Sequence, residues 1–69
     1  MTIVKDEDIR FGKPVVKGTR VTVEDIAGSF YEAGRSVEEV AEDYGIEEEE
    51  VEESLRYHNR ELSSEEVKA

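Results

Sequence analysis

Four basic side chains are concentrated in one short segment of an otherwise acidic chain. Residues 10–20 read RFGKPVVKGTR and contain no acid. Clustered Lys and Arg supply the positive charge that phosphate contacts need, and glycines let another backbone approach closely. The candidate DNA- or phosphate-binding residues are Arg10, Lys13, Lys17 and Arg20. Two interpretations stay open: the segment touches phosphate or pairs with a second copy, or its bases merely neutralise acidic helices.

The second half of the chain carries the opposite charge. The sequence has 69 residues, with 9 Lys and Arg against 19 Asp and Glu, for a formal net charge of -10. Residues 1–35 hold six bases and six acids, so the whole excess of acid lies in residues 36–69. Residues 47–53 contain six glutamates. Such a run would repel the phosphates that line a DNA groove and is typical of a solvated acidic face.

Residue types suited to catalysis or metal binding are scarce. The chain has no Cys, and its one histidine, His58, is expected on the inner or boundary side of a helix. No Ser lies in the strand-to-helix turn of a nucleophile. Consecutive glutamates on a helix point in different directions and cannot converge on one cation. We therefore expect no enzyme, no metal, no cofactor and no small-molecule substrate.

The same composition bears on location and assembly. Apolar runs are only two or three residues long and acidic helices disfavour anionic lipid, so we expect a soluble, cytoplasmic protein without a membrane partner. A single core of this size is marginal, which predicts a homodimer, with Phe11 and a ribbon edge as contacts. An acidic surface with little lysine also favours a halophilic origin, in a cytoplasm of high salt.

The N-terminal residues 1–22 are expected to form an extended arm. Val and Ile alternate there with polar residues, and glycines interrupt them, which predicts strands over residues 3–5 and 15–17. Pro14 cannot donate a ladder hydrogen bond, so it should begin an edge strand. On alternate positions Lys13, Val15 and Lys17 would then share one face.

Beyond Thr22 the apolar period changes from two to about three and a half, which predicts three helices. The first covers residues 23–33, with Thr22 as its N-cap, Gly34 at its end and an apolar stripe of Val23, Ile26, Ala27, Phe30 and Tyr31. Ser36 and Glu39 form a capping box that opens a helix over 37–43, which Gly45 ends. The third helix covers 47–60, with Val51, Leu55, His58 and Leu62 on one side, and residues 63–69 form a frayed tail.

Residues 37–55 have the pattern of a helix-turn-helix, with Ala41 as the small contact and Gly45 as the turn. A DNA-reading unit and a purely structural helical corner both fit this spacing. The expected fold is mostly α: one domain over residues 1–62, with a three-helix, homeodomain-like core over 23–62 and a short N-terminal β-ribbon or extended arm over 1–22.

Three runs carry a family resemblance: GKPVVKGTRV at 12–21, VEDI at 23–26 and EAGRSVEEVAEDY at 32–44. Together they closely resemble the family called domain of unknown function 433, over about residues 3–60. The resemblance implies an extended arm and three helices of helix-turn-helix type. Members are regarded as antitoxin-like, similar to VapB-type antitoxins, and some lie beside a PIN-domain ribonuclease toxin. The family motif often begins with two glycines, whereas Phe11 precedes Gly12 here.

The resemblance therefore implies an antitoxin-like regulator that binds a partner toxin and its own operator DNA. Arg56 and Arg60 are the candidate partner-binding residues, since a guanidinium can enter an acidic nuclease centre. The alternative is an acidic homodimeric protein-interaction module that does not bind DNA.

Overall fold

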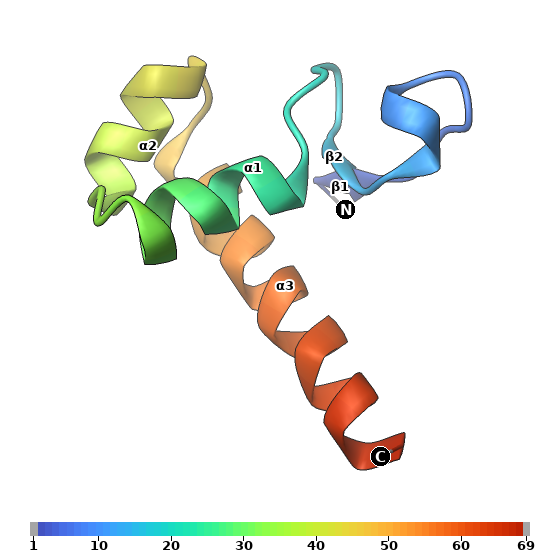
Figure 1. The fold of residues 1–69 in the computed structure, drawn as a ribbon. Coiled ribbons are helices and arrows are strands. Elements are labelled where there is room, and N and C mark those ends of the chain that lie inside the picture. Colours follow the sequence, from blue (N-terminus) through green and yellow to red (C-terminus); the bar gives the residue numbers. More distant parts are fainter. Residues whose placement is uncertain (1, 69) are drawn as a thin grey trace.

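The computed structural model describes residues 2–68 and confirms a mostly helical chain with a short antiparallel β-ribbon near its N-terminus. The elements, in chain order, are β1 (Ile3–Val4), the 3₁₀ turn η1 (Arg10–Gly12), β2 (Val15–Val16), α1 (Val23–Ala27), the π-helical segment η2 (Gly28–Glu32), α2 (Val37–Tyr44) and α3 (Glu48–Lys68). The ribbon lies beside the start of α1, while α1 and α2 both contact α3, and the C-terminal part of α3 projects away from the body (Figure 1).

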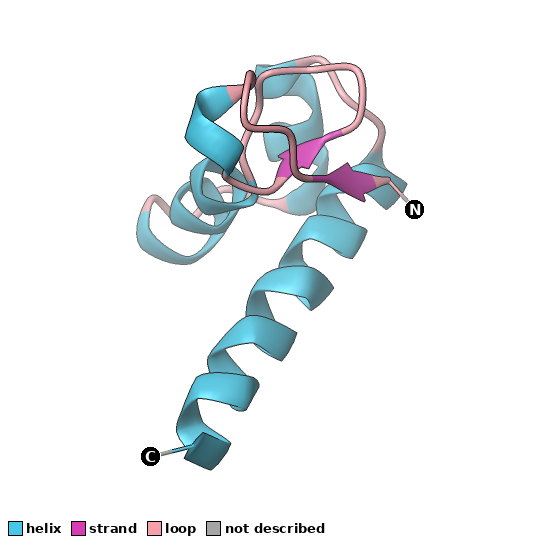
Figure 2. Ribbon diagram, turned by 90° about the vertical axis from the view of Figure 1, so that its right-hand side faces the viewer, coloured by secondary structure: helices cyan, strands magenta, loops and turns pink. Residues whose placement is uncertain are grey.

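The two strands pair in antiparallel register, with Ile3 opposite Val16 and Val4 opposite Val15. On its other side β2 bridges to Thr22, and the Val16 amide donates to the Val21 carbonyl at 2.9 Å. Pro14 directly precedes β2, which is an edge strand of this two-stranded sheet, as expected, and the single bridge to Thr22 covers part of its other side. The missing amide is tolerated, because proline precedes the first paired residue. Figure 2 shows the ribbon at one end of the molecule, opposite the projecting end of α3.

The expected shared face of Lys13, Val15 and Lys17 requires a strand over all three residues, whereas β2 covers only Val15–Val16. Val15 and Val16 point to opposite faces of the ribbon, and both are fully buried. The protein therefore covers the ribbon on both faces, and the two lysines reach solvent from the ends of the strand.

The first helix begins where the sequence predicts. Thr22 accepts a hydrogen bond from the Asp25 amide at 2.9 Å, and the Asp25 carboxylate accepts from the Thr22 amide at 3.3 Å. From Gly28 the turn widens into η2, in which the Ala33 amide donates to the Gly28 carbonyl five residues earlier. Gly34, with φ of 71°, follows as the expected left-handed residue. The widened turn leaves Tyr31 half exposed, rather than on the buried stripe.

Helix α2 has the predicted capping box. The Ser36 hydroxyl accepts from the Glu39 amide, and the Glu39 carboxylate accepts from the Ser36 amide. Gly45, with φ of 67°, ends the helix as predicted. At the start of α3 the Glu50 carboxylate accepts from the Glu47 amide at 2.8 Å. The helix continues to Lys68, beyond the expected end near Arg60, because no Gly or Pro lies after Gly45 to stop it. The frayed tail predicted over 63–69 overlaps this extension, except for residue 69, which is outside the described residues.

A small core joins the ribbon to all three helices. Its buried members are Ile3, Val16, Val23, Ile26, Ala27, Val40, Ala41, Val51 and Leu55. Ser54 is the fully buried polar residue of α3, and its hydroxyl donates to the Glu50 carbonyl at 2.7 Å. Within residues 2–68, no helix has the length and apolar character needed to cross a bilayer.

Candidate functional site

Two of the four candidate bases in the arm are engaged within the chain. The Arg10 guanidinium donates to the Arg20 carbonyl at 3.0 Å and pairs with the Asp25 carboxylate at 3.4 Å. The Lys13 ammonium pairs with the Glu24 carboxylate at 3.2 Å. Both carboxylates lie in the first turn of α1. At these two positions the structure supports the interpretation that arm bases neutralise an acidic helix.

Lys17 and Arg20 are placed differently. Both are exposed, and neither forms an ion pair within the part of the chain that the structure describes. They flank a tight turn in which the Thr19 amide and hydroxyl both donate to the Val16 carbonyl, at 3.0 and 2.8 Å. Gly18 supplies a left-handed residue with φ of 80°. A rigid turn thus presents two cations to solvent, so these are the arm bases open to an outside anion.

The turn before β2 holds an aromatic side chain in solvent. Arg10, Phe11 and Gly12 have positive φ in succession, at 50°, 61° and 79°. The Gly12 amide donates to the Ile9 carbonyl at 3.1 Å, and the Lys13 amide donates to the Arg10 carbonyl at 3.2 Å. A left-handed conformation costs a non-glycine residue on the order of 1 kcal/mol. The Phe11 side chain is nevertheless 94% exposed, so burial within this chain does not offset that cost.

The first turns of α3 present carboxylates to solvent. The exposed members of the run are Glu47, Glu48, Glu49 and Glu52. Hydrogen bonding from Thr2 lowers the pKa of Glu53 and links the arm to α3. No cluster of His, Cys, Asp and Glu among the described residues is arranged to hold a metal ion. In a helix-turn-helix this is the surface that meets a DNA groove, and here it carries negative charge.

Arg56 and Arg60 are both exposed and lie four residues apart on α3. Side chains at this spacing stand one above the other on the same helix face. Arg56 also lines a shallow groove with Thr2 and the glutamates of α3, and its charge helps to lower the pKa of Glu53. The two predicted partner-binding residues therefore lie on one side of α3.

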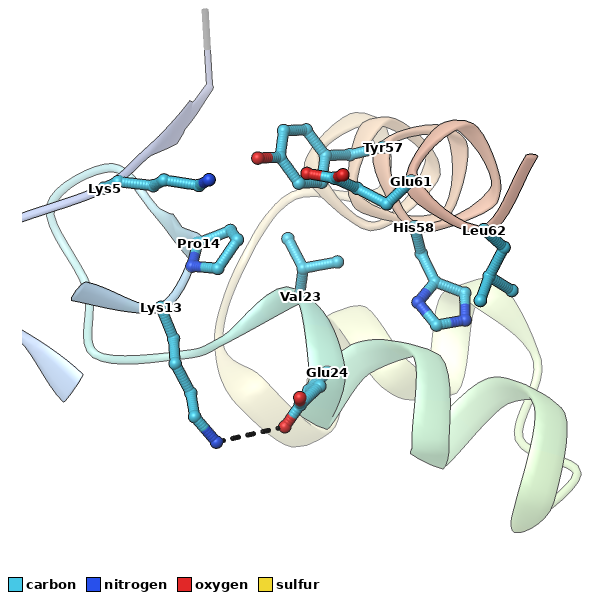
Figure 3. Close-up of a pocket in the computed structure, with 9 residues that line it drawn as sticks. All are labelled: Lys5, Lys13, Pro14, Val23, Glu24, Tyr57, His58, Glu61 and Leu62. Atoms are coloured by element: carbon cyan, nitrogen blue, oxygen red, sulfur yellow. Dashed lines mark hydrogen bonds and ion pairs between the residues drawn. The ribbon is translucent and has the colours of Figure 1, made fainter. Parts of the chain in front are cut away.

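A separate groove lies between the arm, the start of α1 and α3, with a volume of about 390 Å³. Figure 3 shows Pro14 and Val23 between the lysines of the arm and the side chains of α3. The full lining is Lys5, Lys13, Pro14, Val23, Glu24, Tyr57, His58, Glu61 and Leu62. Leu62 is 45% exposed. Sequence patterns did not indicate this groove, because the residues that form it come from three elements.

Arg35 is a structural residue whose role the sequence did not reveal. Its guanidinium donates two hydrogen bonds to the Asp43 carboxylate, at 2.9 and 3.0 Å, and lies 3.5 Å from Glu39. These carboxylates raise the pKa of Arg35, the hydrogen-bonded Asp43 most of all. The clamp fixes the connection between η2 and α2. Its only sequence signal is the i to i+4 spacing to Glu39.

A comparison with known families finds one family model that covers both the arm and the helical corner. The family model described as "Protein of unknown function (DUF433)" matches residues 3–58. The chain belongs to this family. The DUF433 match runs from β1 into α3 and includes Lys17, Arg20 and Arg56, while Arg60 and Leu62 lie beyond it. No curated protein and no solved structure matches the chain.

Proposed function

We propose that this DUF433 protein is a homodimeric, antitoxin-like regulator that binds a partner toxin through α3. The observation that carries the proposal is the pair Arg56 and Arg60, exposed one turn apart on a helix that projects from the body (Figure 1). Two guanidinium groups on one face can reach a single acidic site on another protein. The antitoxin-like character that the family resemblance implies supports the same role.

The chemistry of the pair suits a nuclease toxin, for which a PIN-domain ribonuclease is our proposed class. Such an enzyme needs carboxylates to hold its metal ions. An arginine presents a planar fork of donors that matches a carboxylate in two parallel hydrogen bonds. Arg56 and Arg60 would occupy those carboxylates, and the surrounding glutamates of α3 would remain outside the acidic centre.

Operator binding is the second part of the proposal, and the arm supports it at two positions only. Lys17 and Arg20 are exposed on a rigid turn, whereas Arg10 and Lys13 are paired with carboxylates of α1. Two phosphate contacts per protomer predict a shallow salt dependence, with a slope of log K against log salt of about -1.8 per protomer. The acidic start of α3 would stay out of the groove.

The alternative is a protein-interaction module that never binds DNA. The internal pairing of Arg10 and Lys13 favours it, since half of the candidate phosphate contacts are already neutralised. In that case the arm has a structural role and α3 carries the whole function.

Two double variants separate these possibilities. The protein encoded beside this gene is co-expressed with the chain, and capture and ribonuclease activity are measured. We expect R56E/R60E to abolish capture and to release any nuclease activity, while K17E/R20E binds as the wild type does. Capture that survives R56E/R60E would refute the assignment to α3.

The same variants are titrated with promoter DNA at several salt concentrations. We expect K17E/R20E to lose binding and R56E/R60E to retain it. If the wild type binds no DNA at any salt concentration, the module without DNA binding is the correct description. R56E/R60E is thus the matched control, because it also reverses two exposed charges but lies outside the Lys17–Arg20 turn.

A further inference from the structure

We propose that Phe11 is the anchor of the homodimer and that it inserts into the groove between the arm and α3 of a second copy of this chain. The inference rests on the proposed homodimer and specifies its interface. Each copy would give one anchor and receive one, so the contact has two-fold symmetry and closes as a dimer.

The first reason is the state of Phe11 in the single chain. Its side chain is 94% exposed, and it sits in the turn η1 with positive φ on the residues either side of it as well as on itself. Hydrogen bonds from the Gly12 and Lys13 amides hold this turn in shape. The turn therefore presents a rigid aromatic side chain to solvent, and aromatic anchors of this kind dominate the energy of protein interfaces.

The second reason is that a receiving groove adjoins the anchor. Pro14 belongs to the groove and follows Phe11 by three residues. Figure 3 shows Pro14 and Val23 as the apolar part of the groove, with Leu62 on the α3 side. Its volume of about 390 Å³ is within the range of sites that hold a small ligand. Because each copy carries both an anchor and a groove, a two-fold axis between two copies can place each Phe11 in the other groove.

The distribution of charge favours a second copy of this chain as the occupant of the groove. The chain carries a net charge of -10, all of it in residues 36–69, so two copies repel each other through α2 and the start of α3. Residues 1–35 sum to zero, and the arm is the face through which two copies can approach. The exposed acids Asp6, Glu7 and Asp8 precede the anchor, and Lys5 lies at the groove. Exchange would therefore bring carboxylates of one copy to a lysine of the other.

The area available is sufficient. A stable dimer of standard size covers about 800 Å² on each partner. The whole chain exposes 4860 Å², so the contact would take about one sixth of it. The turn η1, the groove and the exposed Leu62 of α3 would supply residues to such a contact.

The test measures self-association of the full chain by analytical ultracentrifugation. We expect a wild-type dimer at micromolar concentration. Phe11→Ala keeps a Cβ at the same positive-φ position but removes the ring. It should weaken association by about 30-fold per insertion, and about 1000-fold for the two insertions of a dimer. Leu62→Glu places a charge in the groove and should give a similar loss. Circular dichroism checks that both variants fold as the wild type does.

A mixture of the two variants tests whether Phe11 of each copy inserts into the groove of the other. Each variant alone lacks both insertions, but a mixed dimer keeps one intact insertion, that of Phe11 from the L62E chain into the groove of the F11A chain. We expect mixed dimers at concentrations where each variant alone is monomeric. The absence of mixed dimers would overturn the proposal. Two other interfaces would give different results. If Phe11 of one copy packed on Phe11 of the other, only F11A would lose dimerisation. If α3 packed on α3, only L62E would lose it.

Two further outcomes separate the interface from the proposed function. A wild-type dimer that survives F11A overturns this interface and leaves the proposed homodimer standing. A wild-type monomer overturns both, while toxin capture through Arg56 and Arg60 is measured independently. Growth of long polymers from the wild type would also overturn the two-fold exchange, because a contact that does not close propagates.

Discussion

The N-terminal arm and the acidic start of α3 use their charged side chains in opposite ways. In the arm, Arg10 and Lys13 pair with carboxylates of α1, which lie 15 and 11 residues away in sequence, respectively. In α3, four glutamates of the run face solvent. The arm therefore uses charge to fix its position on the helices, whereas α3 leaves its charge as a surface property. Arg10 and Lys13 of the arm therefore form intramolecular contacts, whereas the four glutamates at the start of α3 remain exposed to solvent.

Deletion of core methyl groups has the largest expected effect on stability and tests whether the arm belongs to the same folding unit. Ile26→Ala, at a fully buried site of α1, should lower the free energy of unfolding by about 3 to 5 kcal/mol. Ile3→Ala, in β1 and 6% exposed, should cost about 2 to 3 kcal/mol. Urea titration followed by circular dichroism measures both. A negligible loss for Ile3→Ala would mean that the arm unfolds separately from the helices.

Removal of helix caps comes next and compares a buried cap with an exposed one. Thr22→Ala should cost about 1 to 2 kcal/mol, because the hydroxyl is buried and the Asp25 amide loses its acceptor. Ser36→Ala should cost about 0.5 to 1 kcal/mol, since water can replace an exposed hydroxyl. Thermal unfolding measures both losses. Thr22→Val is the control, because it keeps the shape of Thr22 and removes only the hydroxyl. Equal losses of stability for Ser36→Ala and Thr22→Val would contradict the expectation that a buried cap stabilises more than an exposed one.

Ion pairs should matter less and unequally. Lys13→Met removes a single contact between half-exposed groups and should change stability by at most about 0.5 kcal/mol. Arg35→Met removes a two-pronged contact to Asp43 and should lower the unfolding midpoint further than Lys13→Met. Urea midpoints at low and high salt compare the two. The opposite ranking would show that the Lys13–Glu24 pair stabilises the fold more than the contact between Arg35 and Asp43.

The smallest expected effect is a pH dependence carried by two carboxylates. The Ser36 amide and Arg35 lower the pKa of Glu39, and Thr2 lowers that of Glu53, in each case from the ordinary 4.5. A lowered folded-state pKa stabilises the protein above about pH 4.5, and this stabilisation is lost as the pH falls through the lowered pKa. Glu39→Gln and Glu53→Gln should each flatten the loss of stability below that pH. An unchanged acid profile in both variants would contradict these contacts.

The helices were predictable because their signals are local. The capping boxes at Thr22 and Ser36, and the left-handed glycines at 34 and 45, depend on residues no more than four apart. The strands were also predictable, although the predicted strands, 3–5 and 15–17, are each one residue longer than the observed ones. The end of α3 was not predictable in this way, since the sequence after Arg60 contains no Gly or Pro that would mark a helix end.

The arrangement of the candidate site could be predicted only in part. Composition identified all four arm bases, but not which of them are paired. Those pairs join residues 11 and 15 apart that meet only after the arm folds onto α1. The bridge from β2 to Thr22 was missed for the same reason, since Thr22 belongs to the segment that leads into α1. Local patterns do not carry such information.

The positive φ of Phe11 has a consequence for selection experiments on the stability of this domain. Glycine adopts φ near 61° without the steric cost that a phenylalanine bears, and the described residues leave the ring exposed. Phe11→Gly should therefore leave a monomer that is at least as stable as the wild type. The identity of residue 11 is thus not explained by the folding of one chain, and an engineer who selected variants for heat resistance alone would tend to discard it. Such a selection would improve the scaffold and remove its most exposed aromatic side chain in the same step.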